Sequence, residues 1–175
     1  MKICIFFFAL LLVYSCSEEG KSDFPLSEGL PDQESWGVTI IMTHEGLIRA
    51  KVKSGHLQKF NEKEYIILDE NVVVDFFDLQ ENHTSTLFSD KSEINEKSND
   101  MLAIGNVIAK SDSGITLYTE RLQWIAEDEK LFTKDSIMIT TLEEDTLFGK
   151  GFESNADLES WRILIPSGVT GSEIR

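Results

Sequence analysis

The sequence predicts an all-β fold made of repeated, kinked antiparallel strands around one long interior. The first observation is a repeat of thirty residues in two apolar columns, which are Leu87, Leu117, Leu147 and Met101, Leu131, Trp161. The second is the absence of proline between Pro31 and Pro166, which suits ladders in which most backbone N–H groups pair. The third is that no helix-length amphipathic segment follows the N-terminal apolar run.

Each repeat contains one three-residue step within its two-residue alternation. The three units are Leu87, Ser89, Ser92, Ile94; Leu117, Thr119, Leu122, Trp124; and Leu147, Gly149, Phe152, Ser154. A bulge inserts one extra residue, so it kinks a strand and then restores the same face. A repeat that cannot bury its apolar face alone must stack on its neighbours. Each unit therefore predicts two kinked strands joined by a polar turn.

Alternation and β-branched content place these strands along the chain. Ten are expected, at residues 37–42, 46–54, 63–69, 71–78, 84–93, 101–110, 114–125, 130–140, 146–154 and 161–166. Turn-forming residues such as Asp69-Glu70-Asn71 and Glu127-Asp128-Glu129 separate them. Such short connections favour antiparallel neighbours.

Length and charge limit the function classes. A chain of 175 residues with 41% hydrophobic and 27% charged residues predicts one soluble domain and a short leader. The formal net charge of −15 argues against nucleic acid as a partner, because phosphate binding depends on clustered Lys and Arg.

The first residues have the pattern of a targeting segment. Lys2 precedes an apolar run at 3–13, which is too short for a transmembrane helix and typical of a signal peptide. The run ends at Ser15-Cys16, which resembles the lipobox of bacterial lipoproteins, in which the cysteine is lipidated. An ordinary signal peptide with an incidental cysteine is the alternative. The expected organisation is a signal peptide (1–15), a lipidated tether (16–35), the β domain (36–166) and a tail (167–175).

Catalytic signatures are missing from the sequence. His44, His56 and His83 are isolated, and no second histidine follows at the spacing of a zinc helix. No Gly-x-Ser-x-Gly elbow occurs, and Gly149-x-Gly151 lacks the third glycine and the helix of a phosphate loop. We therefore expect no enzyme, no metal and no cofactor.

Seven segments carry a family resemblance. They are Leu117-Tyr118-Thr119, Leu122-Gln123-Trp124, Leu131-Phe132-Thr133, Ile137-Met138-Ile139, Thr146-Leu147-Phe148-Gly149, Gly151-Phe152-Glu153-Ser154-Asn155 and Trp161-Arg162-Ile163. In these segments the chain resembles the LptC family of lipopolysaccharide-export proteins, and more loosely the related LptA-like proteins. The resemblance implies an open, twisted β jelly roll with a hydrophobic groove. Such a protein accepts lipopolysaccharide from an inner-membrane ABC transporter and passes it to an LptA-like bridge protein, without catalysis.

The resemblance also implies a location in the periplasm, anchored to the inner membrane. The best-known members use a transmembrane helix, whereas this chain is expected to use a lipid on Cys16. Ser17 would favour the outer membrane under the enterobacterial sorting rule, so that membrane stays open as an alternative.

The candidate groove positions for acyl chains are the alternating apolar residues, which in any small sandwich would equally well form a filled core. They are Ile48, Ala50, Val52, Val72, Val74, Phe76, Leu117, Leu122, Trp124, Leu131, Ile137, Ile139, Leu147 and Phe152. Arg49, Lys51 and Lys53 alternate with the first of these, and would either rim a mouth or form a solvated strand face.

Gly149 is the candidate for a partner edge. Glycine within a strand marks a bulge or a close backbone approach, and an exposed sheet edge can accept a strand from a bridge protein. Simple turn geometry is the alternative for Gly149. Two other functions stay open for the whole chain: a structural or adhesive β module that binds protein or glycan, and a soluble LptA-like bridge component.

Overall fold

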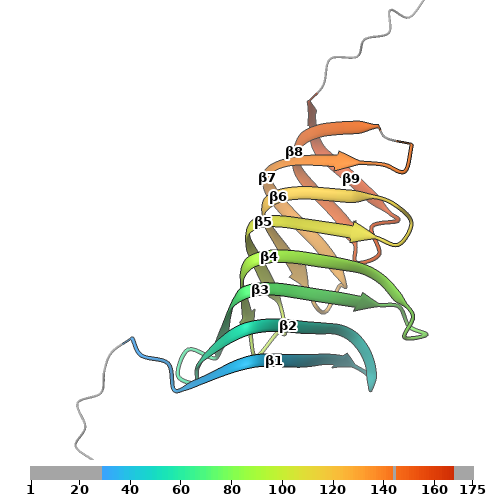
Figure 1. Ribbon diagram of the computed structural model, residues 1–175. Helices are drawn as coiled ribbons and strands as arrows, with labels where there is room; N and C mark the ends of the chain where they lie inside the picture. Colours follow the sequence, from blue (N-terminus) through green and yellow to red (C-terminus); the bar gives the residue numbers. More distant parts are fainter. Residues whose placement is uncertain (1–28, 144, 168–175) are drawn as a thin grey trace, which may run out of the picture. The chain divides into compact units, whose positions relative to one another are not determined.

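The computed structural model describes residues 29–143 and 145–167, and these residues form a single antiparallel sheet of nine strands (Figure 1). The strands are β1 (Gln33–His44), β2 (Leu47–Phe60), β3 (Tyr65–Phe77), β4 (His83–Asn95), β5 (Met101–Ser111), β6 (Thr116–Ile125), β7 (Lys130–Thr140), β8 (Thr146–Asn155) and β9 (Trp161–Ser167). The prediction of an all-β fold is confirmed.

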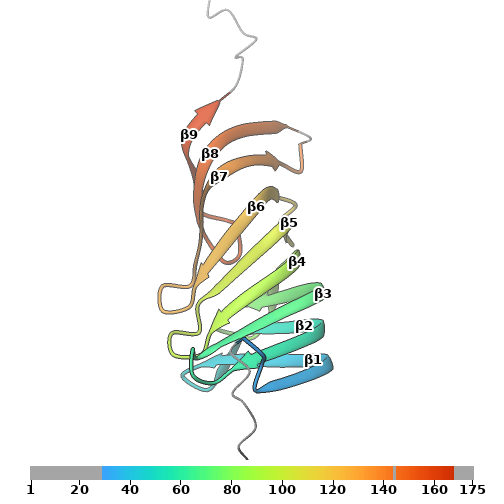
Figure 2. The same ribbon diagram turned by 90° about the vertical axis from the view of Figure 1, so that its left-hand side faces the viewer.

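The spatial order of the strands is their sequence order from β1 to β9. Each inner strand pairs with its two neighbours in sequence, while among the described residues β1 pairs only with β2 and β9 only with β8, so the sheet is open. The strands rotate progressively from β1 to β9, which is the twist that L-residues impose on sheets (Figure 2). Two edges with unpaired backbone groups therefore end the sheet.

A line of bulges crosses the sheet through the middle of the strands. Register shifts interrupt six successive pairings, from β2–β3 through β7–β8. They coincide with the three-residue steps predicted in β4, β6 and β8, with shifts at Phe88/Lys91, Thr119/Gln123 and, opposite Gly151, Thr133/Ser136. The predicted kinks are confirmed. The strands from β2 to β8 bend at this line, so their two halves contribute to two layers that enclose the interior.

In place of the two strands expected at residues 63–69 and 71–78, the structure has the single strand β3. The Asp69-Glu70-Asn71 segment that suggested a turn is the bulge of this strand. Glu70 and Asn71 have φ values of 59° and 64°, and the register with β4 shifts between Asp69 and Val72. Acidic and amide residues favour turns, but they also tolerate the left-handed conformation that a bulge requires.

The core lies between the two layers. Side chains from both sides of the bulge line meet there, as shown by the rings of Phe76 and Trp124, whose centroids lie 5.3 Å apart in an edge-to-face arrangement. Fully buried side chains extend along the stack from Val52 on β2 to Phe152 on β8. The stacked repeats thus share one continuous apolar interior.

The sheet begins three residues before the expected domain start at Trp36 and ends one residue after Pro166. The expected signal peptide and Cys16 lie outside the described residues. Within residues 29–143 and 145–167, no helix has the length and the apolar character that a membrane crossing requires.

Candidate functional site

The predicted groove residues come together in the interior. Twelve of the fourteen are buried, with exposed fractions of 0–4%: Ala50, Val52, Val72, Val74, Phe76, Leu117, Leu122, Trp124, Leu131, Ile137, Ile139 and Phe152. These side chains pack against one another in one cluster, together with others such as Leu87 and Met101. The interior is therefore filled by the chain's own side chains in this structure, and the two layers lie in contact.

Two of the fourteen positions differ from the expectation. Leu147 is 40% exposed; it pairs with Ile139 on β7, and among the described residues the β8–β9 pairing begins at Phe148. Ile48 is only half-buried and lies at the start of β2, where its backbone N–H donates to Glu81 Oε1 at 2.8 Å. Both lie at the ends of strands, where the alternation in the sequence continues but the covering layer does not.

A bulge at the start of β2 turns Arg49 into the interior, so Arg49 forms neither a rim nor a solvated face. Met42 on β1 pairs with Ala50 and Thr43 pairs with Ile48, which leaves Arg49 without a partner residue in the ladder. Arg49 and Ala50 are consequently both buried. The Arg49 guanidinium forms an ion pair with Glu129, which belongs to the β6–β7 turn on the opposite layer. Such re-aiming of a side chain is what a bulge provides.

Carboxylates surround this end of the interior. In the β3–β4 turn, Asp78 accepts hydrogen bonds from the side chain and backbone of Asn82 and from the backbone N–H of Gln80. The Asn82 side chain contributes most to holding the pKa of Asp78 below its usual value, and the positive charge of Arg49 contributes further. Arg49, the one buried cation among the residues that the structure describes, is therefore compensated by acidic groups.

The β8–β9 loop connects the two layers further along the sheet. The Ser85 hydroxyl donates to the Ala156 carbonyl at 2.5 Å, and the Ser111 hydroxyl donates to the Asp157 carbonyl at 2.7 Å. Between these carbonyls and β9, Leu158 enters the core with 0% exposure and a φ of 61°. The loop thus covers the interior beside the start of β4 and the end of β5.

Gly149 has the close backbone approach that was expected, but the strand beside it belongs to this chain. Gly149 pairs with Ile137 on β7 and with Pro166 on β9. A Cβ atom at Gly149 would lie 2.8 Å from the Ile165 carbonyl oxygen. The free edge at this end of the sheet is therefore β9. The sequence suggests Gly149 as the partner edge, but Gly149 lies on β8, one strand inside that edge.

Gly149→Ala should loosen the β8–β9 pairing, because the added methyl would also meet Ile163 Cγ2. Overpacking of this kind costs about 1–3 kcal/mol. We expect faster amide hydrogen exchange in β9 and an unchanged rate in β2. Adding Ile163→Ala should restore part of the protection, since it removes one of the two clashes. Equal exchange in the variant and the parent chain would contradict a tight approach at this position.

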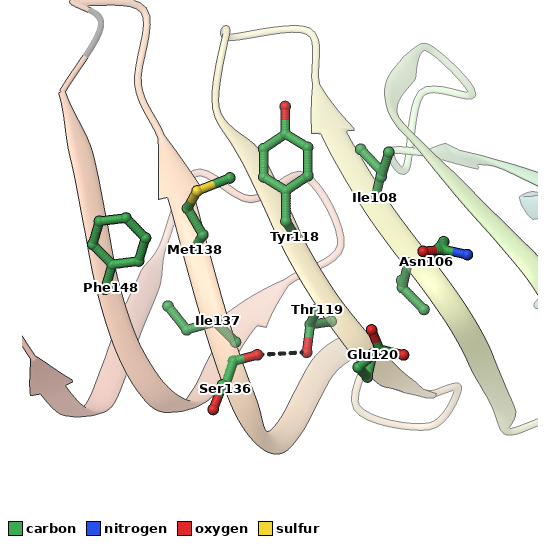
Figure 3. A pocket seen from close by; sticks show the side chains of 10 residues that line it. Asn106, Ile108, Tyr118, Thr119, Glu120, Ser136, Ile137, Met138 and Phe148 are labelled. Atoms are coloured by element: carbon green, nitrogen blue, oxygen red, sulfur yellow. Dashed lines mark hydrogen bonds between the residues drawn. The ribbon is translucent and has the colours of Figure 1, made fainter.

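A second apolar surface lies on the outer face of the sheet and was missed by the sequence reasoning. Ile108, Tyr118, Met138 and Phe148 occupy one register row across β5 to β8, and they line a cavity of about 460 Å³ (Figure 3). Its floor includes the hydrogen bond from Thr119 Oγ1 to the Ser136 carbonyl, at 3.1 Å. The uninterrupted apolar run Ile137-Met138-Ile139 was the available signal, because it places apolar side chains on both faces.

Two of the three histidines have carboxylate partners. Nδ1 of His56 lies 2.9 Å from Asp69 Oδ1, and Nδ1 of His83 lies 2.9 Å from Asp112 Oδ2. Among the residues that the structure describes, no three His, Cys, Asp or Glu side chains gather in a way that could hold a metal ion.

Comparison with known proteins places this architecture. No curated protein matches the chain. Among solved structures, it is similar to LptH of Pseudomonas aeruginosa, described as the LptA-homologous periplasmic component of the lipopolysaccharide transport device. That similarity has a TM-score of 0.53 at 11% identity, over 72% of this chain and 89% of LptH, so it supports the fold. The family model for LptC-related lipopolysaccharide-assembly proteins matches residues 3–172. The chain therefore belongs to the LptC-related family of lipopolysaccharide assembly.

Proposed function

We propose that this protein is a membrane-anchored periplasmic carrier that accepts lipopolysaccharide from an inner-membrane ABC transporter and passes it to an LptA-like bridge protein. A lipid on Cys16 provides the anchor, and the transporter provides the energy. The observation that carries the proposal is an unclosed sheet around a continuous apolar interior, in a member of the LptC-related family.

Acyl chains enter the interior by separating the two layers, because the chain's own side chains fill it. Each methylene group that leaves water contributes about 0.8 kcal/mol, so several acyl chains offset the loss of contacts between the layers. The polar contacts that must yield are few: the Arg49–Glu129 ion pair and the hydrogen bonds of Ser85 and Ser111 to the β8–β9 loop. With a net charge of −15, the protein gains no general attraction for an anionic lipid, so acyl burial provides the affinity.

Handover to the bridge protein uses β9. This strand pairs on one side only, and its Leu164 and Ile165 are 43% and 63% exposed. A strand from a bridge protein can extend the sheet here by main-chain hydrogen bonds, which also brings the two interiors into line.

Photocrosslinking in cells tests the carrier role. A photoreactive amino acid at Leu122, which is fully buried, should capture lipopolysaccharide when the transporter is active. The same amino acid at Glu120 is the matched control, because Glu120 lies two residues away on β6 and is exposed. Ile139 on β7 offers a second interior position.

Capture of lipid from Leu122 and Ile139 but not from Glu120 is the expected result. If the interior positions yield protein adducts and never lipopolysaccharide, the chain is a structural or adhesive β module. Lipid adducts in a chain released from the membrane would instead identify it as a soluble bridge component.

A further inference from the structure

We propose that the interior contains a hydrogen-bonding site for an acyl carbonyl, formed by Arg49 and Trp124, which receives the ester or amide linkage of a lipid. The site deepens the proposed carrier function and rests on it. It lies where the end of β1 and the start of β2 meet the β4–β5 and β6–β7 turns. A cavity of about 150 Å³ lies there, and Arg49, Trp124, Glu127 and Met42 are among the residues that line it.

The first observation is a set of buried donors without acceptors. Arg49 Nε and Nη1 and Trp124 Nε1 are buried and have no hydrogen-bond partner among the described residues. The Arg49 side chain is 9% exposed, and Trp124 as a whole is 3% exposed. A buried donor left unpaired costs about 1–3 kcal/mol, so these groups favour any molecule that supplies an acceptor. Guanidinium and indole groups donate only, which requires an acceptor oxygen in the ligand.

The surrounding charges select a neutral acceptor. The charge of Arg49 is already compensated by Glu129, and Glu127 adds another carboxylate to the lining. Asp78 lies close enough for Arg49 to influence its ionisation. A phosphate or carboxylate would therefore meet like charges, whereas a carbonyl oxygen accepts hydrogen bonds without adding a negative charge.

The surroundings of the cavity favour a linkage at the end of a hydrocarbon chain. Its volume of about 150 Å³ has room for a linkage of a few heavy atoms. Trp124 also contacts Phe76 in the apolar core. A carbonyl bound to the Trp124 and Arg49 N–H groups thus leaves its hydrocarbon chain beside the interior.

A pair of single-chain lipids tests this site. The full chain, kept soluble in amphipol, is titrated with myristoyl lysophosphatidylcholine and with its tetradecyl ether analogue, both below their critical micelle concentrations. The two lipids share the head group and nearly the same chain, and the ether lacks the carbonyl oxygen. We expect the ester to bind about threefold to tenfold more tightly, the range that one net hydrogen bond provides.

Substitutions at Trp124 and Arg49 test whether their N–H groups cause the preference for the ester. Trp124→Phe keeps an aromatic ring against Phe76 and removes the N–H, so it should reduce the preference for the ester; Trp161→Phe should not. Trp124→Phe with Arg49→Met should abolish the preference. In ¹⁵N-indole NMR spectra of the unsubstituted chain, the ester should move the Trp124 Nε1–H resonance downfield, and the ether should not.

The outcomes separate the two proposals. Equal binding of ester and ether would overturn the carbonyl site and leave the carrier function standing. Absence of binding by both lipids would overturn the carrier function and the carbonyl site together. A preference for the ester that survives the double variant would place the carbonyl elsewhere and overturn this assignment.

Discussion

Phe152→Ala is expected to lower the free energy of unfolding by about 3–5 kcal/mol, the range for deleting a buried aromatic side chain. Phe152 is fully buried on β8, and its ring lies 6.4 Å from that of Trp161 on β9 in a stacked arrangement. Its loss leaves a cavity in the core beside Trp161. Urea denaturation of the full chain, followed by tryptophan fluorescence, measures the effect.

Phe148→Ala is the matched control for this prediction. It removes the same ring from the same strand, but Phe148 faces outward and is 50% exposed. A change within about 0.5 kcal/mol is expected, as for most surface positions. If both variants lose the same stability, the outward row would be as well packed as the interior, which would contradict the assignment of the two faces.

Glu129→Ala should cost about 3 kcal/mol, because it leaves the Arg49 charge buried without its counterion. The value is at the lower end of the range because the Glu129 side chain is 31% exposed, so water can partly replace it. Arg49→Met should cost less, below about 1 kcal/mol, since Glu129 can then turn to solvent and the methionine fills the space of the arginine stem. Thermal and urea unfolding of the two variants measure the order.

The double variant Arg49→Met/Glu129→Ala provides the control for that order. Its cost should be close to that of Arg49→Met alone, because no uncompensated charge is left inside. If Arg49→Met proves more costly than Glu129→Ala, the arginine stabilises the sheet by packing, and the ion pair is secondary.

The sequence predicted the fold well because its repeat and its kinks are local patterns. The three-residue steps at Ser89/Ser92, Thr119/Leu122 and Gly149/Phe152 are visible in the spacing of apolar residues, and the register shifts lie at those positions. At Asp69-Glu70-Asn71 the composition of a turn hid a bulge, because both structures need residues that tolerate positive φ.

The features that could not be predicted from the sequence depend on contacts between residues far apart in the chain. Nothing near Arg49 indicates that a bulge opposite Met42 turns it inward, or that its counterion is Glu129, eighty positions away. Leu158 stands in a polar loop, and its burial depends on Ser85 and Ser111 holding that loop against the other layer. The alternation at Gly149 likewise showed a tight approach without showing that β9 makes it.

The pairing of every strand with its immediate predecessor has a consequence for how the molecule comes into being. Because each strand pairs with its neighbours in the sequence, the sequence separation between pairing strands is low. A low contact order speeds folding. The strands can therefore pair one after another from the N-terminus as the chain is synthesised, as in a stacked repeat array. At each stage the most recently added strand forms the edge of the sheet. β9 is added last, so it is the edge strand of the finished sheet.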